Sequence, residues 1–353
     1  MFNEVPDEIT SYEEYSRMIK DTLLDDLVSA YPDARIRDND SVWRALTKVY
    51  KYCNQERFIF VLDERDYIYH QSYMTDADKI AYTKFLSNLL KDKAYVELVY
   101  MTGILPISKY SSGSELNMFF EFPMATATAY STYFGFTDEE VDALYQIYLK
   151  TEPSPQVTRE GLELWYDGYE TASEIKLYNP RSVVGALTYN QLRSYWTSSG
   201  PYDEIFYYIG ANVDAVKDDI ALMVAANPVP AKVQEYAATS MELKTKDEIF
   251  SAMVVYGFLN YSHGYVSIPN KELMDKFAEV VQKEPSMGNV YKLTKESGRM
   301  FAATKAGDTR TMTELMEYAH NTHSPLQVYN NETELASIIR WVYLKAMMPS
   351  LLN

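Results

Sequence analysis

The chain has 353 residues, 47% of them hydrophobic, which is enough for two or three folded domains with sizeable cores. Its formal net charge of −17 argues against a broad phosphate-binding surface, because nucleic-acid affinity comes mainly from Lys and Arg side chains. One cysteine, Cys53, excludes an intramolecular disulfide and fits a reducing compartment.

We find neither a secretory signal peptide nor a membrane-spanning helix in this sequence. Residues 1 to 8 have neither a basic region nor an apolar core, so they do not form a secretory signal peptide. The most apolar helical stretch, Ile249 to Leu259, is too short to span a bilayer. We therefore expect a cytoplasmic protein with no membrane association.

Two amphipathic helices are predicted first, over residues 11 to 30 and after Ser41, and an apolar run then ends in a group of acids. The run Phe58 to Leu62 is rich in aromatic and β-branched residues, which is typical of a strand buried on both faces. Asp63 and Glu64 follow it directly. Ligands bind at the carboxyl ends of strands in open α/β sheets, and in P-loop NTPases a Walker B acid lies there. The alternative interpretation is a core strand with a solvated acidic exit.

A second strand is predicted after one intervening helix. The residues Thr75-Asp76-Ala77-Asp78 are predicted to begin that helix, and the apolar run Tyr95 to Met101 follows it. Strand, helix and strand in this order predict a right-handed crossover between neighbouring parallel strands. Thr102 then lies at the strand's end, where NTPases place a residue that senses the γ-phosphate. A Thr-Gly turn that merely closes the strand explains the same residues.

The middle of the chain is predicted to be mainly helical. A capping box at Thr137 begins one helix, the Glu152 to Pro155 segment breaks it, and we place a domain boundary there. Gly168 is expected to take a positive φ, and Asn179 with Pro180 predicts another helix start. Further helices are predicted over Leu192 to Trp196, Asp203 to Ile209 and Val213 to Ala226.

A helix, hairpin and helix follow. The helix from Ile249, the hairpin Tyr261 to Pro269 and the helix Leu273 to Val281 have the sizes of a winged-helix unit. The expected wing, Ser262-His263-Gly264, carries no Lys or Arg, so we favour packing against protein over nucleic-acid binding. The rest of the chain is predicted to be helical.

Several short motifs occur in a fixed order that resembles one protein family. They are Asp63-Glu64-Arg65-Asp66, Met101-Thr102-Gly103-Ile104-Leu105-Pro106-Ile107, Leu116-Asn117-Met118-Phe119, Phe134-Gly135-Phe136-Thr137, Trp165-Tyr166-Asp167-Gly168-Tyr169, Tyr178-Asn179-Pro180, Tyr195-Trp196 and Ile268-Pro269-Asn270. Together they look like the AAA-ATPase-like family of gut bacteria of the Lachnospiraceae and Bacteroides type. Its members join a P-loop ATPase domain to a PD-(D/E)XK nuclease-like domain.

The resemblance implies a role for each acid-site residue. Asp63 would be the Walker B acid that holds Mg²⁺ and ATP, Glu64 the acid that orients the attacking water, and Thr102 the sensor. The family usually has Tyr where this chain has Arg65. It also has a Walker A loop upstream, whereas no glycine of this chain is followed by lysine. The nuclease motifs that follow in the family are not found here either.

The fold class we expect is therefore α/β, with a partial P-loop NTPase-like parallel sheet followed by a mainly helical, winged-helix-like region. The expected domains are residues 1–152, a lid over 153–285 and a helical lead into a nuclease-like domain over 286–353. Without the phosphate cradle, the acids Asp63, Glu64 and Asp66 should repel a triphosphate, so ATP binding is expected to be weak. Two functions stay open, namely an inactive interaction or regulatory module with a protein partner or a second copy, and a Mg-dependent ATPase completed by another chain.

Overall fold

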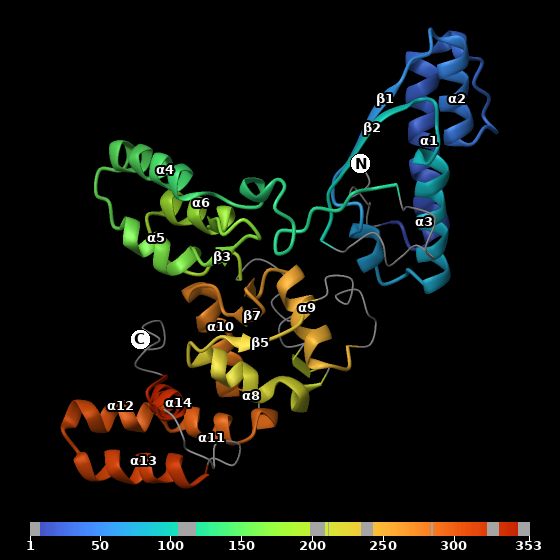
Figure 1. Ribbon diagram of the computed structural model, residues 1–353. Coiled ribbons are helices and arrows are strands. Elements are labelled where there is room, and N and C mark those ends of the chain that lie inside the picture. Colours follow the sequence, from blue (N-terminus) through green and yellow to red (C-terminus); the bar gives the residue numbers. More distant parts are fainter. Residues whose placement is uncertain are drawn as a thin grey trace. The chain divides into compact units, whose positions relative to one another are not determined.

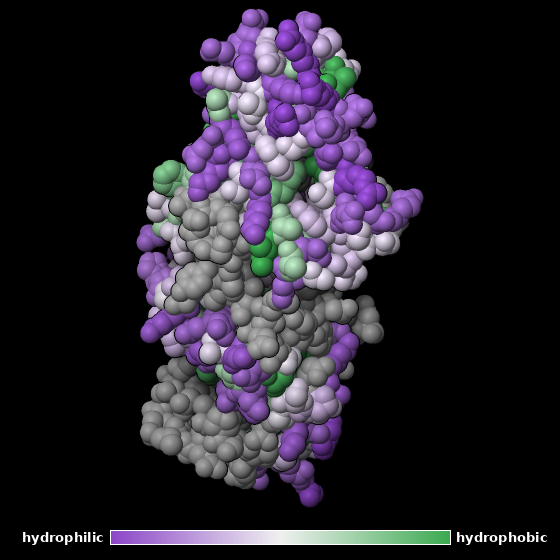
Figure 2. Space-filling model, turned by 90° about the vertical axis from the view of Figure 1, so that its right-hand side faces the viewer, coloured by the Kyte–Doolittle hydropathy of each residue, from purple (hydrophilic) through white to green (hydrophobic). Residues whose placement is uncertain are grey.

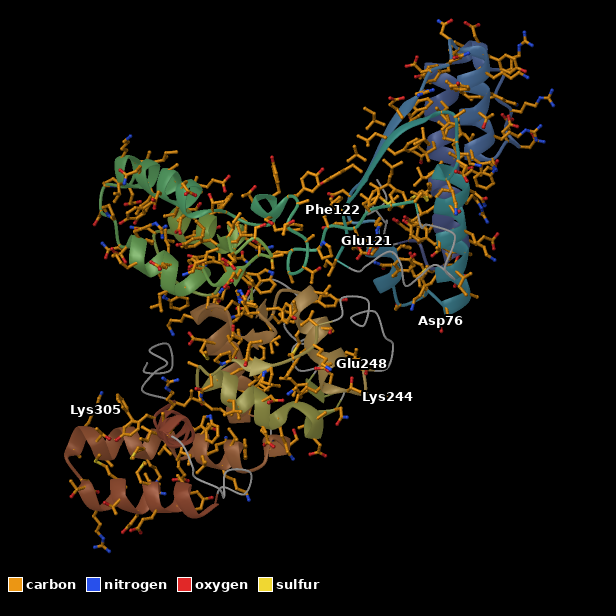
Figure 3. All side chains as sticks on the ribbon, in the orientation of Figure 1. Asp76, Glu121, Phe122, Lys244, Glu248 and Lys305 are labelled. Carbon is orange, nitrogen blue, oxygen red and sulfur yellow. The ribbon has the colours of Figure 1, made fainter. Side chains whose placement is uncertain are left out.

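The computed structural model describes residues 8–104, 118–197, 209–210, 212–233, 243–283, 285–322 and 332–344 (Figure 1). Contacts divide the chain into unit 1, Met1–Glu121, and unit 2, Phe122–Asn353, and Figure 3 labels the two residues at this division. The fold is mixed α/β with small sheets, as the sequence predicts. Within the described ranges, no helix has the length and apolar character needed to cross a membrane.

The molecular surface is mainly hydrophilic. Hydrophilic residues cover most of the described surface on the side drawn in Figure 2, and only small hydrophobic patches lie between them. Such a surface agrees with the net charge of −17.

Unit 1 packs three helices against one side of a parallel strand pair (Figure 1). The helices are α1 (Tyr12–Ala30), α2 (Val42–Tyr52) and α3 (Asp76–Leu90), and the strands are β1 (Phe58–Leu62) and β2 (Val96–Met101). Two short 3₁₀ turns, η1 (Pro32–Ala34) and η2 (Tyr67–His70), connect them. The strands are adjacent and parallel, which confirms the predicted crossover.

Local capping explains where two of these helices begin. The Ser11 side chain accepts a hydrogen bond from the Glu14 amide before α1. The helix α3 begins where the sequence predicts, and Thr75 and Asp78 form a complete capping box before it. Ser41 has the extended backbone of an N-cap but makes no side-chain cap bond. These bonds satisfy amide groups that have no partner within the first helical turn.

The strands differ from the prediction in their burial, because only one face is covered. Phe58, Phe60 and Leu62 face the helical core. The alternate side chains are exposed, and we call them the open face: Ile59 (64% exposed), Val61 (67%), Leu98 (56%) and Tyr100 (60%). The predicted burial of β1 on both faces is therefore wrong, since all three helices of unit 1 pack on the same side.

Unit 2 begins with a helical layer. It contains η4 (Ser131–Tyr133), α4 (Asp138–Thr151), α5 (Arg159–Tyr166), β3 (Tyr169–Glu170), β4 (Lys176–Leu177) and α6 (Pro180–Tyr189). The capping box at Thr137 and the helix start at Asn179 are confirmed. The predicted boundary at 152 falls between α4 and α5, whose side chains share one apolar cluster, and both helices lie within the unit that starts at Phe122.

The next described part of unit 2 has a three-stranded sheet and three helices, in which the predicted helix, hairpin and helix occur in order. The elements are α8 (Val213–Val224), β5 (Val229–Pro230), α9 (Lys246–Val255), β6 (Asn260–Ser262), β7 (Tyr265–Ser267) and α10 (Lys271–Lys283). The hairpin β6–β7 is confirmed, and β5 pairs with the far side of β7. The chain continues through η6 (Pro285–Met287), α11 (Asn289–Lys295), α12 (Ser297–Ala306), α13 (Thr309–Thr322) and α14 (Glu332–Val342).

The predicted helix over Leu192 to Trp196 does not form. The amides of Tyr195, Trp196 and Thr197 instead donate to Oε1 of Glu272 on α10, at 2.7, 2.8 and 3.1 Å. A buried carboxylate from a distant element thus takes the donors that a helix would have used. Most of the helix predicted over Asp203 to Ile209 lies outside the described residues.

Candidate functional site

The three predicted site residues lie together at the carboxyl ends of β1 and β2. The Thr102 hydroxyl donates to Oδ1 of Asp63 at 2.5 Å, and its oxygen accepts a hydrogen bond from the Glu64 amide at 2.9 Å. Thr102 therefore contacts both acidic residues across the strand pair. The parallel register makes this possible, because Leu62 lies opposite Met101 and the next two residues leave the sheet side by side.

Backbone bonds fix the same turn. The Thr102 amide donates to the Leu62 carbonyl at 2.9 Å, and the Arg65 amide donates to the Thr102 carbonyl at 3.1 Å. Glu64 takes a left-handed backbone conformation, with φ of +47°, which is unusual for a residue with a side chain. Such strained positions persist only where the surrounding structure holds them. Here Thr102 supplies that support through its backbone and side chain.

These bonds limit what Thr102 can do chemically. A threonine hydroxyl has one hydrogen to donate, and here it is directed at Asp63. The hydroxyl would have to leave Asp63 before it could donate to a phosphate. Thr102 acts in this geometry as a positioning residue for the turn that carries Asp63 and Glu64. Both carboxylates are exposed.

Arg65 and Asp66 differ from the two acids before them because they are buried, with 6% and 3% exposure. The Tyr82 hydroxyl on α3 donates to the Arg65 carbonyl at 2.9 Å. Asp66 approaches Gly103 so closely that a Cβ there would lie 2.7 Å from its Oδ1. Asp66 thus does not join Asp63 and Glu64 at the surface, contrary to the expectation that all three would face a triphosphate.

Tyrosine hydroxyls support the turn from the helical side. Burial raises the pKa of Tyr82 well above its ordinary value, and burial also raises the pKa of Tyr69. Both hydroxyl groups therefore stay protonated at neutral pH. The Tyr69 hydroxyl lies 3.0 Å from the Thr83 hydroxyl, and the two rings pack edge to face. The site rests on a rigid aromatic support.

The site fits only part of a Mg-nucleotide complex. An exposed carboxylate such as Asp63 suits Mg²⁺, which prefers oxygen ligands and usually takes one or two carboxylates together with substrate phosphates. In the part of the chain that the structure describes, no group of three or more His, Cys, Asp or Glu side chains is placed to hold a metal. The sequence also contains no Gly-Lys pair of a phosphate cradle. These residues alone therefore do not form a complete site for Mg-ATP.

Comparisons with protein-family models, with curated proteins and with solved structures found no match for this chain. The family resemblance and the roles that it implies for Asp63, Glu64 and Thr102 thus stay predictions. What the structure adds is their proximity and the bonds that join them.

Sequence reasoning missed the open face. Its four side chains belong to runs that are apolar at nearly every position, so the alternation that marks a half-exposed strand is not visible. The signal that could have found it is the number of strands. Only two apolar runs suited to a parallel sheet occur near the site, and two strands with one crossover helix cannot bury both faces.

Proposed function

We propose that unit 1 is a protein-interaction module whose binding surface is the open face. The observation that carries this proposal is that four large apolar side chains are more than half exposed on adjacent parallel strands. Parallel sheets are almost always covered on both faces, and a contiguous apolar patch on a soluble protein usually marks an interaction site.

The free energy available from covering the open face is substantial. Complete burial of one such side chain contributes about 1.5–3 kcal/mol, so covering four that are about 60% exposed contributes about 4–7 kcal/mol. A protein partner gains this energy only in part, because association also costs translational and rotational freedom. The amount is nevertheless enough to make the open face the centre of a specific interface.

The predicted P-loop NTPase-like sheet supports the same proposal. Unit 1 resembles part of a P-loop NTPase-like sheet, in which further strands and helices would cover the exposed side. A protein partner or a second copy would supply that cover. The acids at the end of the sheet would then serve the interaction rather than catalysis, so the chain alone would be inactive.

The winged-helix-like region is proposed to pack against protein and not against nucleic acid. Its order of helix, strand, helix and hairpin, with β5 paired to β7, supports the winged-helix interpretation. The helix α9, which would have to enter a DNA groove, is buried from Ile249 through Val254. The wing residue His263 lies 3.4 Å from Glu174 and 3.9 Å from Glu170, so the wing tip is acidic.

A second candidate function is a Mg-dependent ATPase whose phosphate site comes from another chain. The proximity of Thr102 and Asp63 at the carboxyl ends of adjacent parallel strands supports this candidate, since NTPases use a polar residue and an acid at neighbouring strand ends. Calorimetric titration of the purified chain with Mg-ATP tests this candidate. Weak binding with no turnover supports the interaction module. Micromolar binding, with turnover that Glu64→Gln abolishes, would favour the ATPase instead.

Site-specific photocrosslinking tests the interaction module directly. A photoreactive amino acid in place of Val61 should give crosslinks to protein in cells, and the same amino acid in place of Ile80 should not. Ile80 is a matched control because it is an exposed aliphatic residue on α3, away from the open face. Light scattering would show whether the crosslinked partner is a second copy. Equal crosslinking at the two positions, or none at Val61, would contradict the proposal.

A further inference from the structure

The open face has the width of a single helix. Neighbouring strands lie about 4.8 Å apart, so two strands present a surface about 10 Å wide, which matches the diameter of an α-helix. Its side chains form two successive rungs, with Ile59 opposite Leu98 and Val61 opposite Tyr100. Successive rungs on one face are about 7 Å apart, which a helix spans in little more than one turn.

Charged residues bracket the two rungs along the strands. At the amino end, Arg57 and Glu97 form an exposed ion pair with an N–O distance of 2.9 Å, so this end is close to neutral. At the carboxyl end, Asp63 and Glu64 are both exposed and both acidic. The surface is therefore apolar in the middle, neutral at one end and negative at the other.

From this pattern we infer that the partner docks on the open face with an amphipathic α-helix that carries Lys or Arg at the end lying over Asp63 and Glu64. The inference rests on the proposed interaction function and names the chemistry of its partner. Helices are the elements that cover parallel sheets, and α1, α2 and α3 already cover the opposite face. Electrostatic complementarity at one end sets the direction in which the helix binds.

Two synthetic peptides of about 14 residues test the inference, since this length spans the roughly 20 Å from Arg57 to Asp63. Both have the same Leu and Ala stripe at helical spacing. One ends in two Lys residues, and the other ends in two Glu residues at the same positions. Binding to the full chain is measured by fluorescence anisotropy, and a peptide of the same composition with a scrambled stripe is the specificity control.

The expected result is that the Lys-ended peptide binds at least about fivefold more tightly than the Glu-ended one. Val61→Lys should weaken binding by roughly tenfold or more, and Ile80→Lys should leave it unchanged. The double variant Asp63→Lys with Glu64→Lys should reverse the preference between the two peptides. This reversal cannot come from misfolding, because it requires the variant to bind.

Other outcomes overturn the inference in distinguishable ways. Equal binding of the Lys-ended and Glu-ended peptides would contradict the proposed charged end of the partner helix. Equally tight binding of the scrambled peptide would contradict the proposed amphipathic helix. Failure of all peptides to bind, together with a dimer in light scattering that Val61→Lys dissociates, would replace the helix by a second copy and leave the interaction function standing. Failure to bind with a monomer and no Val61 crosslinks would remove both proposals.

Discussion

Replacement of Glu272 by alanine should be among the most destabilising single changes in unit 2. The Glu272 side chain is 1% exposed. Its Oε1 accepts three consecutive backbone amides, those of Tyr195, Trp196 and Thr197, and its Oε2 accepts the Ser182 hydroxyl at 2.6 Å. One carboxylate thus joins α10, α6 and the segment that follows α6.

The magnitude follows from the groups left without an acceptor. Each buried donor that loses its partner costs about 1–3 kcal/mol, and the donors affected are three amides, the Ser182 hydroxyl and, at 3.5 Å, the Thr197 hydroxyl. Removal of a buried charge and entry of water offset part of this cost, so we expect a net loss of about 3–5 kcal/mol. Glu272→Gln retains an acceptor for the amides, so it should cost less, about 1–2 kcal/mol.

The assay is urea denaturation followed by tryptophan fluorescence, combined with hydrogen exchange at the three amides. Three of the four tryptophans, Trp165, Trp196 and Trp341, lie in unit 2. Glu279→Ala is the matched control on the same helix, because Glu279 forms ion pairs with Lys276 and Lys283 near the surface and such pairs contribute about 0.5 kcal/mol. A loss below about 1 kcal/mol for Glu272→Ala, with amide protection unchanged, would refute the reasoning.

Three further predictions concern a buried acid, a glycine and a helix cap. Burial raises the pKa of Asp167, so its charged form destabilises the fold above the ordinary carboxyl pKa, and protonation relieves this destabilisation. Asp167→Asn should therefore stabilise unit 2 at about pH 8 in thermal unfolding, and the gain should shrink as the pH falls toward the ordinary carboxyl pKa. Gly168→Ala should cost at least about 3 kcal/mol in urea unfolding, because φ is +101° and a Cβ would lie 1.9 Å from the Pro269 carbonyl oxygen. Gly264→Ala is the control, because φ is +85° but no atom lies near the added Cβ, and it should cost only about 1–2 kcal/mol. Thr75→Ala should lower the free energy of unfolding of unit 1 by about 1 kcal/mol, because it removes the cap of α3. Ser41→Ala removes no side-chain cap bond and should cost less. Equal losses of stability for the two variants would contradict the assigned capping box.

Local signals in the sequence predicted the structure well. The capping box at Thr137 and the helix starts at Thr75 and Asn179 depend on residues within one turn of one another, so they can be predicted from spacing alone. The parallel pairing of β1 with β2 was also predictable, because a crossover helix of this length permits few other arrangements.

Features that depend on distant residues were not predictable. The segment Leu192 to Trp196 has the composition of a helix, yet its last amides bind Glu272, about 76 residues later in the chain. Asp66 looked equivalent to Asp63 in the sequence, but the absence of a side chain at Gly103 lets Asp66 turn inward. In both cases a contact between elements decided the outcome, and no local pattern encodes such a contact.

The acids and the open face belong to one continuous surface, which links the two candidate functions. Side chains alternate along a strand, so Ile59 and Val61 lie on the same face of β1, and Asp63 is the first exposed residue of the turn that follows the strand. Thr102 then holds Asp63 at the end of that face through the hydroxyl bond of 2.5 Å. A partner that covers Val61 must therefore lie beside Asp63 and alter its solvation. If the ATPase proposal holds, binding of protein at the open face and binding of Mg²⁺ at Asp63 should therefore be coupled, since each changes the surroundings of the other.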